Sequence, residues 1–419
     1  MNTRIHTIVI GAGQAGLALS RCLTERGVEH VLVERGRVAQ RWSERWDSLR
    51  LLSPNWMTRL PGWQYRGDDP DGFMKRDEVI AFLRDYARSF DAPVEEETEV
   101  LSVTPIGGLW RVVTNRATWI ADNVVIATGH CHEARIPACS RDLPADVAQL
   151  STLDYRNPSQ IAEGAVLVVG ASASGVQLAR ELRRAGRDVV LSVGRHFRVP
   201  RRYRGRDIHY WLDRTGIMTR PLTDMRNVDG ARREPSLQLV GGTEDLDLHA
   251  LAAEGVQLAG RIASFDRGRA HFADDLESSM ADADRRMKHI LERIDKHIAA
   301  HGADRRFPRN SCQLPVASSQ CGTAWRNSPG NWPLATGNKI RTVLWATGYK
   351  RTYPWLHASV LDTNGEIRHT RGRTPARGLY VLGLQFLTRR NSSLIDGVGR
   401  DAEEIAADIA ETNAWKEAA

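Results

Sequence analysis

The stretch IHTIVIGAGQAGLALSRCLTERGVEHVLVE, residues 5–34, joins an apolar run, a cluster of glycines and an amphipathic pattern. Residues 5–10 predict a buried strand, and the apolar residues after the glycines recur at helical spacing as far as Gly27. Residues 30–34 predict a second parallel strand. The order strand, tight turn, helix, strand predicts a Rossmann-like unit at the start of the chain.

The three glycines of this turn have distinct expected roles. Gly11 allows the tight turn, Gly13 lets the backbone approach a pyrophosphate, and Gly16 lets the helix pack on the strand. The phosphates are expected at the positive N-terminal end of the helix. Glu34 lies about 20 residues further on, where an acidic side chain accepts hydrogen bonds from the ribose of an unphosphorylated adenosine. We therefore predict a dinucleotide site here.

A second unit, GAVLVVGASASGVQLARELRRAGRDVVLSVGR, spans residues 164–195 and repeats this outline. Gly170, Ser172 and Gly175 take the glycine positions, with a small serine in the middle. The second strand ends at Arg195, where the first unit has Glu34. Because a guanidinium group binds the 2′-phosphate that a carboxylate would repel, this unit predicts NADPH.

Arg195 begins a basic segment that also contains Arg201 and Arg202. We predict that these arginines bind the phosphates of NADPH. A solvated basic loop or a nucleic-acid surface is the alternative for the cluster as a whole. No other part of the sequence supports nucleic acid, although the formal net charge is +7.

Two bound nucleotides indicate hydride transfer from NADPH to a flavin, so the predicted cofactors are FAD and NADPH. Two apolar strands end in Ala-Thr-Gly, at residues 127–129 and 346–348, and are expected to mark passages between the nucleotide domains. The predicted fold is α/β, with an NADPH domain (160–335) inserted into a discontinuous FAD domain (1–159 and 336–419). A helical insertion is expected at about 272–302.

Composition narrows the class of protein. The chain of 419 residues is long enough for two or three domains, no apolar run reaches membrane length, and we expect a protein without an N-terminal leader. Its five cysteines include no C-x-x-C pair, which argues against a disulfide framework, a zinc ribbon or a thioredoxin-like pair. We expect a cytoplasmic protein without a metal site and leave a homodimer open.

These motifs resemble the class B flavin-dependent monooxygenases, in particular the CzcO-type proteins related to flavin-containing monooxygenases and plant YUCCA enzymes. The resemblance covers most of the chain and includes RWDSLRLLSPNWMTRLPGW, PDGFMKRDEV, YRNP, PRRYRG, WATGY and GVGRDAEEIA. It implies that NADPH reduces FAD and that a flavin C4a-hydroperoxide transfers one oxygen atom to a small organic substrate, at nitrogen, sulfur or a carbonyl carbon. Asn55 beside the flavin and Tyr155 are the catalytic candidates that it implies.

The chain departs from the monooxygenase fingerprint F-x-G-x-x-x-H-x-x-x-Y of this family. Ala145, Val147 and Ser151 occupy the Phe, Gly and His positions, and only Tyr155 is retained. A flavoprotein reductase or oxidase that passes electrons to a partner or to dioxygen is therefore the alternative function. A nucleotide-binding redox sensor without turnover is a third hypothesis.

Several remaining patterns have competing interpretations. His130, Cys131 and His132 are adjacent and lack a distant fourth ligand, which disfavours a metal site. Trp42 and Trp46 are one helical turn apart, which favours core packing, with contact to the flavin or the substrate as the alternative. The pattern from Leu276 to Ile298 predicts an amphipathic helix docked on its own domain, with a lid or a dimer contact as alternatives. The Ser-, Gly-, Pro- and Asn-rich stretch 311–338 is expected to be an irregular surface segment.

Further cofactor contacts are expected next to the principal motifs. The N-terminus of the last helix is expected to face the flavin ring and to stabilise negative charge there. The complete set of predicted cofactor-binding residues is Gly11, Gly13, Gly16, Glu34, Arg35, Trp42, Ala127, Thr128, Gly129, Gly170, Ser172, Ser174, Gly175, Arg195, Arg201, Arg202, Ala346, Thr347, Gly348, Gly383 and Leu394.

Overall fold

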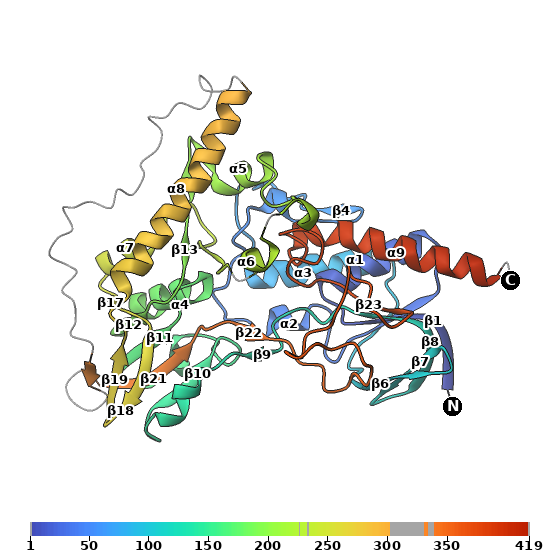
Figure 1. The fold of residues 1–419 in the computed structure, drawn as a ribbon, viewed down its shortest axis with the longest axis horizontal. Helices are drawn as coiled ribbons and strands as arrows, with labels where there is room; N and C mark the ends of the chain where they lie inside the picture. The colour runs from blue at the N-terminus through green and yellow to red at the C-terminus, as the bar shows by residue number, and fades with distance from the viewer. Residues whose placement is uncertain (1, 226, 233, 302–330, 334–338, 418–419) are drawn as a thin grey trace.

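The computed structural model describes residues 2–225, 227–232, 234–301, 331–333 and 339–417. Two separate sheets lie toward opposite ends of the molecule, and both ends of the chain lie on the side of the first sheet (Figure 1). The described residues include no helix long and apolar enough to cross a membrane.

The first sheet contains seven strands. In hydrogen-bonded order they are β5 (Val94–Glu95), β2 (His30–Val33), β1 (Asn2–Ile10), β8 (Thr118–Ile126), β7 (Leu109–Thr114) and β6 (Val100–Ile106), with β23 (Leu379–Val381) also on β8. Strands β1, β2, β5, β8 and β23 pair in parallel, whereas β6 and β7 form an antiparallel extension. The helices beside this sheet are α1 (Gln14–Glu25), α2 (Gln40–Ser43), α3 (Arg76–Arg88) and α9 (Ile395–Glu417).

The core of this first part is built from the apolar runs of the central strands. Ile8 and Val9 on β1 and Leu32 on β2 are fully buried, as expected for strands covered on both faces. Helix α1 packs against α9, and buried residues of both helices, such as Leu19 and Ile409, belong to the same core. The closing helix therefore supports the helix that follows the first glycine turn.

The second sheet is entirely parallel. Its order is β10 (Ala148–Ser151), β21 (Ile340–Trp345), β11 (Ala165–Val169), β12 (Val189–Ser192) and β17 (Gln257–Ala259). On β11, Val166 and Val168 face a core shared with α4 (Ala173–Arg184) and α7 (Leu248–Ala253). Leu167 and Val169 face the opposite core. This core includes residues of β18 (Ile262–Asp266) and β19 (Arg269–Phe272), and β20 (Asn331–Pro333) pairs with β19.

The predicted amphipathic helix is α8 (Leu276–Ala300), which rises along the second domain in Figure 1. Met287, Leu291, Ile294 and Ile298 of its apolar stripe are buried against a third core. That core includes residues of α5 (Ile208–Arg214), so the stripe docks on its own domain as predicted.

The remaining short elements are η1 (Asn55–Met57), β3 (Arg59–Leu60), β4 (Trp63–Gln64), β9 (Glu133–Ala134), η2 (Ala138–Asp142), η3 (Pro158–Gln160), β13 (Phe197–Arg198), β14 (Arg202–Tyr203), β15 (Arg206–Asp207), η4 (Leu222–Asp224), α6 (Val228–Arg232), β16 (Leu237–Gln238) and β22 (Tyr349–Lys350).

The two-sheet α/β organisation is confirmed, but the predicted domain boundaries need a correction. Strand β10 (148–151) was expected in the first part of the FAD domain and β21 (340–345) in its second part, whereas both belong to the second sheet. The error arises because the sheet that a strand joins depends on its pairing partners, which local apolar patterning does not specify. Of the predicted irregular segment 311–338, only residues 331–333 are described.

Candidate active site

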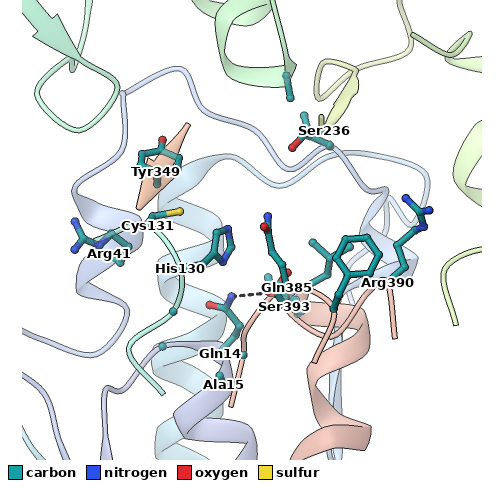
Figure 2. A pocket seen from close by; sticks show the side chains of 18 of the residues that line it. Gln14, Ala15, Arg41, His130, Cys131, Ser236, Tyr349, Gln385, Arg390 and Ser393 are labelled. Atoms are coloured by element: carbon teal, nitrogen blue, oxygen red, sulfur yellow. Dashed lines mark hydrogen bonds between the residues drawn. The ribbon is translucent and has the colours of Figure 1, made fainter. Parts of the chain in front are cut away.

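A large cavity of about 1540 Å³ connects the two nucleotide-binding units. Its lining includes Gly11 and Gly13 from the first turn, and Ala173 and Ser174 from the start of α4 in the second. Pockets for one small molecule usually measure about 300–1,000 Å³, so this cavity has room for more than one ligand. Figure 2 shows part of the lining, where Gln14, His130 and Gln385 surround a common space.

The first turn has the backbone geometry that a dinucleotide requires. Gly11 has φ +107°, a conformation in which a side chain would be strained, and a Cβ at this position would lie 2.8 Å from the carbonyl oxygen of Ala127. A Cβ on Gly16 would lie 1.9 Å from the Gly11 carbonyl, so this glycine permits close packing of α1. Around Gly13, by contrast, the position of a Cβ is open. This open approach to the N-terminus of α1 fits a pyrophosphate group.

Glu34 lies at the end of β2, where the sequence predicts a ribose contact. Its carboxylate accepts hydrogen bonds from the backbone N–H of Ala12 (2.9 Å) and of Gly36 (3.1 Å), and the residue lines the cavity. These bonds orient the carboxylate in a largely buried position, which suits recognition of sugar hydroxyl groups. The first turn and Glu34 together fit the adenosine diphosphate part of FAD.

The second turn repeats the first in its backbone angles. Gly170 has φ +106°, and Ser172, which precedes α4, has φ −83° and ψ −173°, compared with −84° and −172° for Gly13. A Cβ on Gly175 would lie 1.7 Å from the Gly170 carbonyl, the same obstruction as in the first turn. The Ser172 hydroxyl donates to the carbonyl of Ser236 (3.0 Å), so its side chain links the turn to a neighbouring loop.

The two Ala-Thr-Gly segments occupy matching positions in the two sheets. Residues 127–129 follow β8 and line the cavity, whereas residues 346–348 follow β21 and lie outside its lining. The carbonyl oxygen of Ala346 lies 2.5 Å from where a Cβ on Gly170 would stand, which parallels the contact of Ala127 with Gly11. Ala346, Thr347 and Gly348 were predicted to bind a cofactor, but none of them lines the cavity, and Ala346 instead packs against the second turn.

Five other residues predicted to contact a cofactor lie at the cavity. Arg35, Trp42, Gly383, Leu394 and Arg195 line the cavity, and Trp42 donates through Nε1 to the side-chain oxygen of Gln14 (3.2 Å). Helix α9 begins at the cavity, since Ile395 and Asp396 are part of its lining. The end of the helix expected to face the flavin thus lies at the cavity wall.

The structure places Arg201 and Arg202 elsewhere, which corrects their predicted role. The guanidinium group of Arg201 is 1% exposed and donates through Nε to Asp207 (2.7 Å) while lying 4.3 Å from the centre of the Phe73 ring. Arg202 is exposed and donates to the carbonyl of Gly205. Neither residue lines the cavity, since Arg201 is held by Asp207 in the interior and Arg202 lies at the exposed surface.

The two catalytic candidates also lie outside the cavity lining. Asn55 is buried, donates to the carbonyl of Asp69 (2.9 Å) and accepts from the backbone N–H of Met74 (2.8 Å). Tyr155 is fully buried and donates its hydroxyl to Glu181 (3.0 Å). Both side chains hold structural hydrogen bonds away from the cavity, so these positions do not support the predicted catalytic roles.

A polar cluster around Cys131 was not assigned to the site from the sequence. Arg45 donates to the Tyr349 hydroxyl (2.6 Å) and its guanidinium carbon lies 5.0 Å from the centre of that ring, and both residues line the cavity with Cys131 and His130. Burial alone would raise the pKa of Cys131, but the hydrogen bond and charge of His130, together with Arg45, outweigh it and lower the pKa to about 7. Burial lowers the pKa of the neighbouring His132.

Helix α8 carries a second stripe of residues, which was not predicted from the sequence. Arg286, His289 and Arg293 recur at intervals of three and four residues and form a basic stripe, which lines the cavity together with Asp282 and Arg285. The helical spacing of these basic residues was a usable signal. The prediction for this helix used only its apolar residues, from Leu276 to Ile298, and did not consider the basic ones.

Comparisons with known proteins agree with this geometry. The sequence profile of the pyridine nucleotide-disulphide oxidoreductases matches residues 8–215. An uncharacterized CzcO-like oxidoreductase of Geobacillus kaustophilus is 32% identical over 97% of this chain and 98% of its own length. A flavin-containing monooxygenase from Stenotrophomonas maltophilia has a TM-score of 0.68 at 19% identity, covering 98% of this chain and 99% of that one. A bacillithiol disulfide reductase from Staphylococcus aureus has a TM-score of 0.62 at 14% identity, over 98% and 99%.

The two turns and the shared cavity define a flavoprotein oxidoreductase with two Rossmann-like domains. The chain belongs to the CzcO-like oxidoreductases, a family of the class B flavin monooxygenase type. The resemblance expected from the sequence motifs is thereby confirmed.

Proposed function

We propose that this protein is an NADPH-dependent FAD monooxygenase acting on a small organic molecule. The single observation that carries the proposal is one continuous cavity lined by both nucleotide turns. When bound there, FAD and NADPH supply hydride transfer and activation of dioxygen. In the overall reaction, substrate, dioxygen, NADPH and a proton give the oxygenated substrate, water and NADP⁺.

The protein's own residues have binding and shielding roles in this proposal. Gly13 and the N-terminus of α1 receive the FAD pyrophosphate, and Arg195 binds the 2′-phosphate of NADPH. The start of α9 presents its positive end toward the cavity, which favours negative charge nearby. Beyond both turns, the cavity continues past Leu212 and Met218, whose apolar side chains help to exclude water.

The test is oxygenation under isotopically labelled dioxygen. Purified enzyme with FAD is supplied with NADPH and panels of amines, sulfides and ketones, and products are analysed by mass spectrometry. We expect one labelled oxygen atom in a product, with less hydrogen peroxide formed than NADPH consumed. Oxygen from solvent, or equal amounts of peroxide and oxidised NADPH with every substrate, would contradict the proposal.

A reductase or oxidase function is the second candidate, and the altered fingerprint favours it. Ser151 occupies the histidine position of that motif and is buried, with its hydroxyl donating to Asp154 (2.6 Å). The bacillithiol disulfide reductase also shares the fold. Among the described cysteines, only Cys131 lines the cavity, so no cysteine pair for thiol exchange is seen there. Anaerobic electron transfer from NADPH to an added acceptor, without oxygenated products, would favour this function.

A further inference from the structure

The basic stripe of α8 extends well beyond the region expected to bind NADPH. Arg286 and Arg195 line the same cavity, and burial of Arg286 together with the positive charges of Arg195 and Arg285 lowers the pKa of Arg286. Arg293 is seven residues further along the helix, a displacement of about 10 Å. The two arginines therefore face different regions of the same cavity.

Arg293 converges with two arginines from other segments. Burial first, and then the charges of Arg220 and Arg390, lower the pKa of Arg293. Backbone bonds bring the two other segments together: Leu222 donates to the carbonyl of Thr388 (2.9 Å), and Asn391 donates to that of Met218 (3.2 Å). All three arginines line the cavity.

The positive charge of this cluster is only partly compensated within the described residues. Arg390 pairs with Glu234 (2.8 Å), and Arg220 donates to the backbone carbonyl of Asp224. Arg293 makes no hydrogen bond or ion pair to any part of the chain that the structure describes. Like charges gathered in a partly enclosed cavity repel each other, and a bound anion relieves this repulsion.

The wall beside the arginines is apolar. Leu212, Ile217 and Met218 are buried in the core beneath α8, and Ile290 of α8 packs on that core. All four also line the cavity. A ligand in this region would meet apolar side chains on one side and guanidinium groups on the other.

We propose that Arg220, Arg293 and Arg390 form an anion subsite, and that the oxygenated substrate is an organic acid with an apolar body whose carboxylate binds there. This inference rests on the proposed monooxygenase function, since it names the substrate class of that same cavity. A phosphate group of NADPH is also an anion that arginines bind. The experiment below therefore distinguishes a substrate carboxylate from this phosphate as the occupant of the subsite.

Calorimetric titration of the FAD-containing enzyme provides the test. The probes are 3-phenylpropionate, its neutral analogue 3-phenylpropionamide, and NADP⁺. We expect the carboxylate to bind at least tenfold more tightly than the amide. Arg293→Gln and Arg220→Gln should each weaken carboxylate binding by about 10–100-fold, as expected for loss of a charged hydrogen bond. Binding of the amide and of NADP⁺ should change by less than about twofold.

Two further variants provide controls. Lys288→Gln removes a positive charge from an exposed position of the same helix outside the cavity and should leave all three affinities unchanged. Arg195→Gln should weaken the binding of NADP⁺ and leave the binding of 3-phenylpropionate unchanged. Equal binding of acid and amide, absence of binding by either, or weakened NADP⁺ binding in Arg293→Gln would each overturn the anion subsite. NADPH consumption and labelled-oxygen incorporation, measured on the same enzyme, report separately on the proposed function.

Discussion

At the residue scale, the surroundings of Cys131 determine its protonation. The hydrogen bond and charge of His130 and the charge of Arg45 stabilise the thiolate more than burial destabilises it, so the pKa falls to about 7. The opposite holds for Cys22 of α1, whose burial in the core raises the pKa to about 12. Burial also raises the pKa of Cys139. Three cysteines of one chain therefore differ in the pH at which each becomes nucleophilic.

We predict that Cys131 is alkylated by iodoacetamide with a half-maximal rate near pH 7, because only the thiolate reacts. Lowering the pH below 7 protonates it and slows the reaction. Peptide mapping by mass spectrometry should find Cys22 and Cys139 far less modified at the same pH. His130→Gln should move the midpoint upward, and a wild-type midpoint above pH 8.5 would contradict the assignment.

A second prediction concerns the choice between NADPH and NADH. Arg195→Ser should weaken NADP⁺ binding by about 10–100-fold, the effect of losing charged hydrogen bonds to a phosphate, with little change for NAD⁺. Arg202→Ser is the matched control, since Arg202 is exposed outside the cavity. Calorimetry with both nucleotides measures the effect. Equal losses for NADP⁺ and NAD⁺ in Arg195→Ser would exclude 2′-phosphate recognition by this residue.

At the element scale, the two strand–turn–helix units have nearly identical turns despite different sequences. Helices α1 and α4 each contain 12 residues, and the residues before them differ by one degree in both φ and ψ. In each unit the third glycine permits close packing of helix on turn. The serine at position 172 is accommodated because the backbone there is extended, a conformation that any residue adopts.

The open space at Gly13 leads to a prediction about this element. Gly13→Ala should fold normally, because a Cβ meets no atom within 4 Å, but should retain less FAD, since the methyl group occupies the approach of the pyrophosphate. Gly242→Ala also adds a methyl group in open space and serves as the control. The ratio of flavin to protein absorbance after purification gives the FAD content. Full FAD content in Gly13→Ala would contradict the proposed phosphate position.

At the scale of the whole molecule, the cavity depends on both sheets and on the segments that connect them. Residues 127–129 leave the first sheet and line the cavity, and Tyr349 lines it just after β21 of the second sheet. Helix α8 supplies a further wall through its basic stripe, while its apolar stripe anchors it to the second domain. Binding at the cavity should consequently influence the stability of the folded protein.

We predict that removal of FAD lowers the melting temperature. A ligand present at about 1,000 times its Kd stabilises the folded state by about 4 kcal/mol, provided that it binds only this state. Calorimetric melting of protein with and without FAD tests this, and re-addition of FAD should restore the higher value. Gly13→Ala should show a smaller difference. Identical melting temperatures with and without FAD would argue against a buried site in the first unit.

The sequence by itself determined the local units of this protein. Both glycine turns, their flanking strands and α8 could be predicted because apolar periodicity and the conformational freedom of glycine are encoded within short segments. The positions of Glu34 and Arg195 at the ends of β2 and β12 followed from the same local register.

Only the tertiary structure decided which residues reach the cavity. Arg201 and Arg195 belong to one basic segment, yet Arg201 is buried against Asp207 while Arg195 faces the cavity. Tyr155 retains the last position of the monooxygenase fingerprint, but its side chain is buried in the core of the second domain. Strands β10 and β21 join the second sheet, whereas they were expected in the FAD domain. The physical reason is that side-chain direction and strand pairing depend on contacts between distant segments, such as those that bring Arg220 and Arg390 toward Arg293.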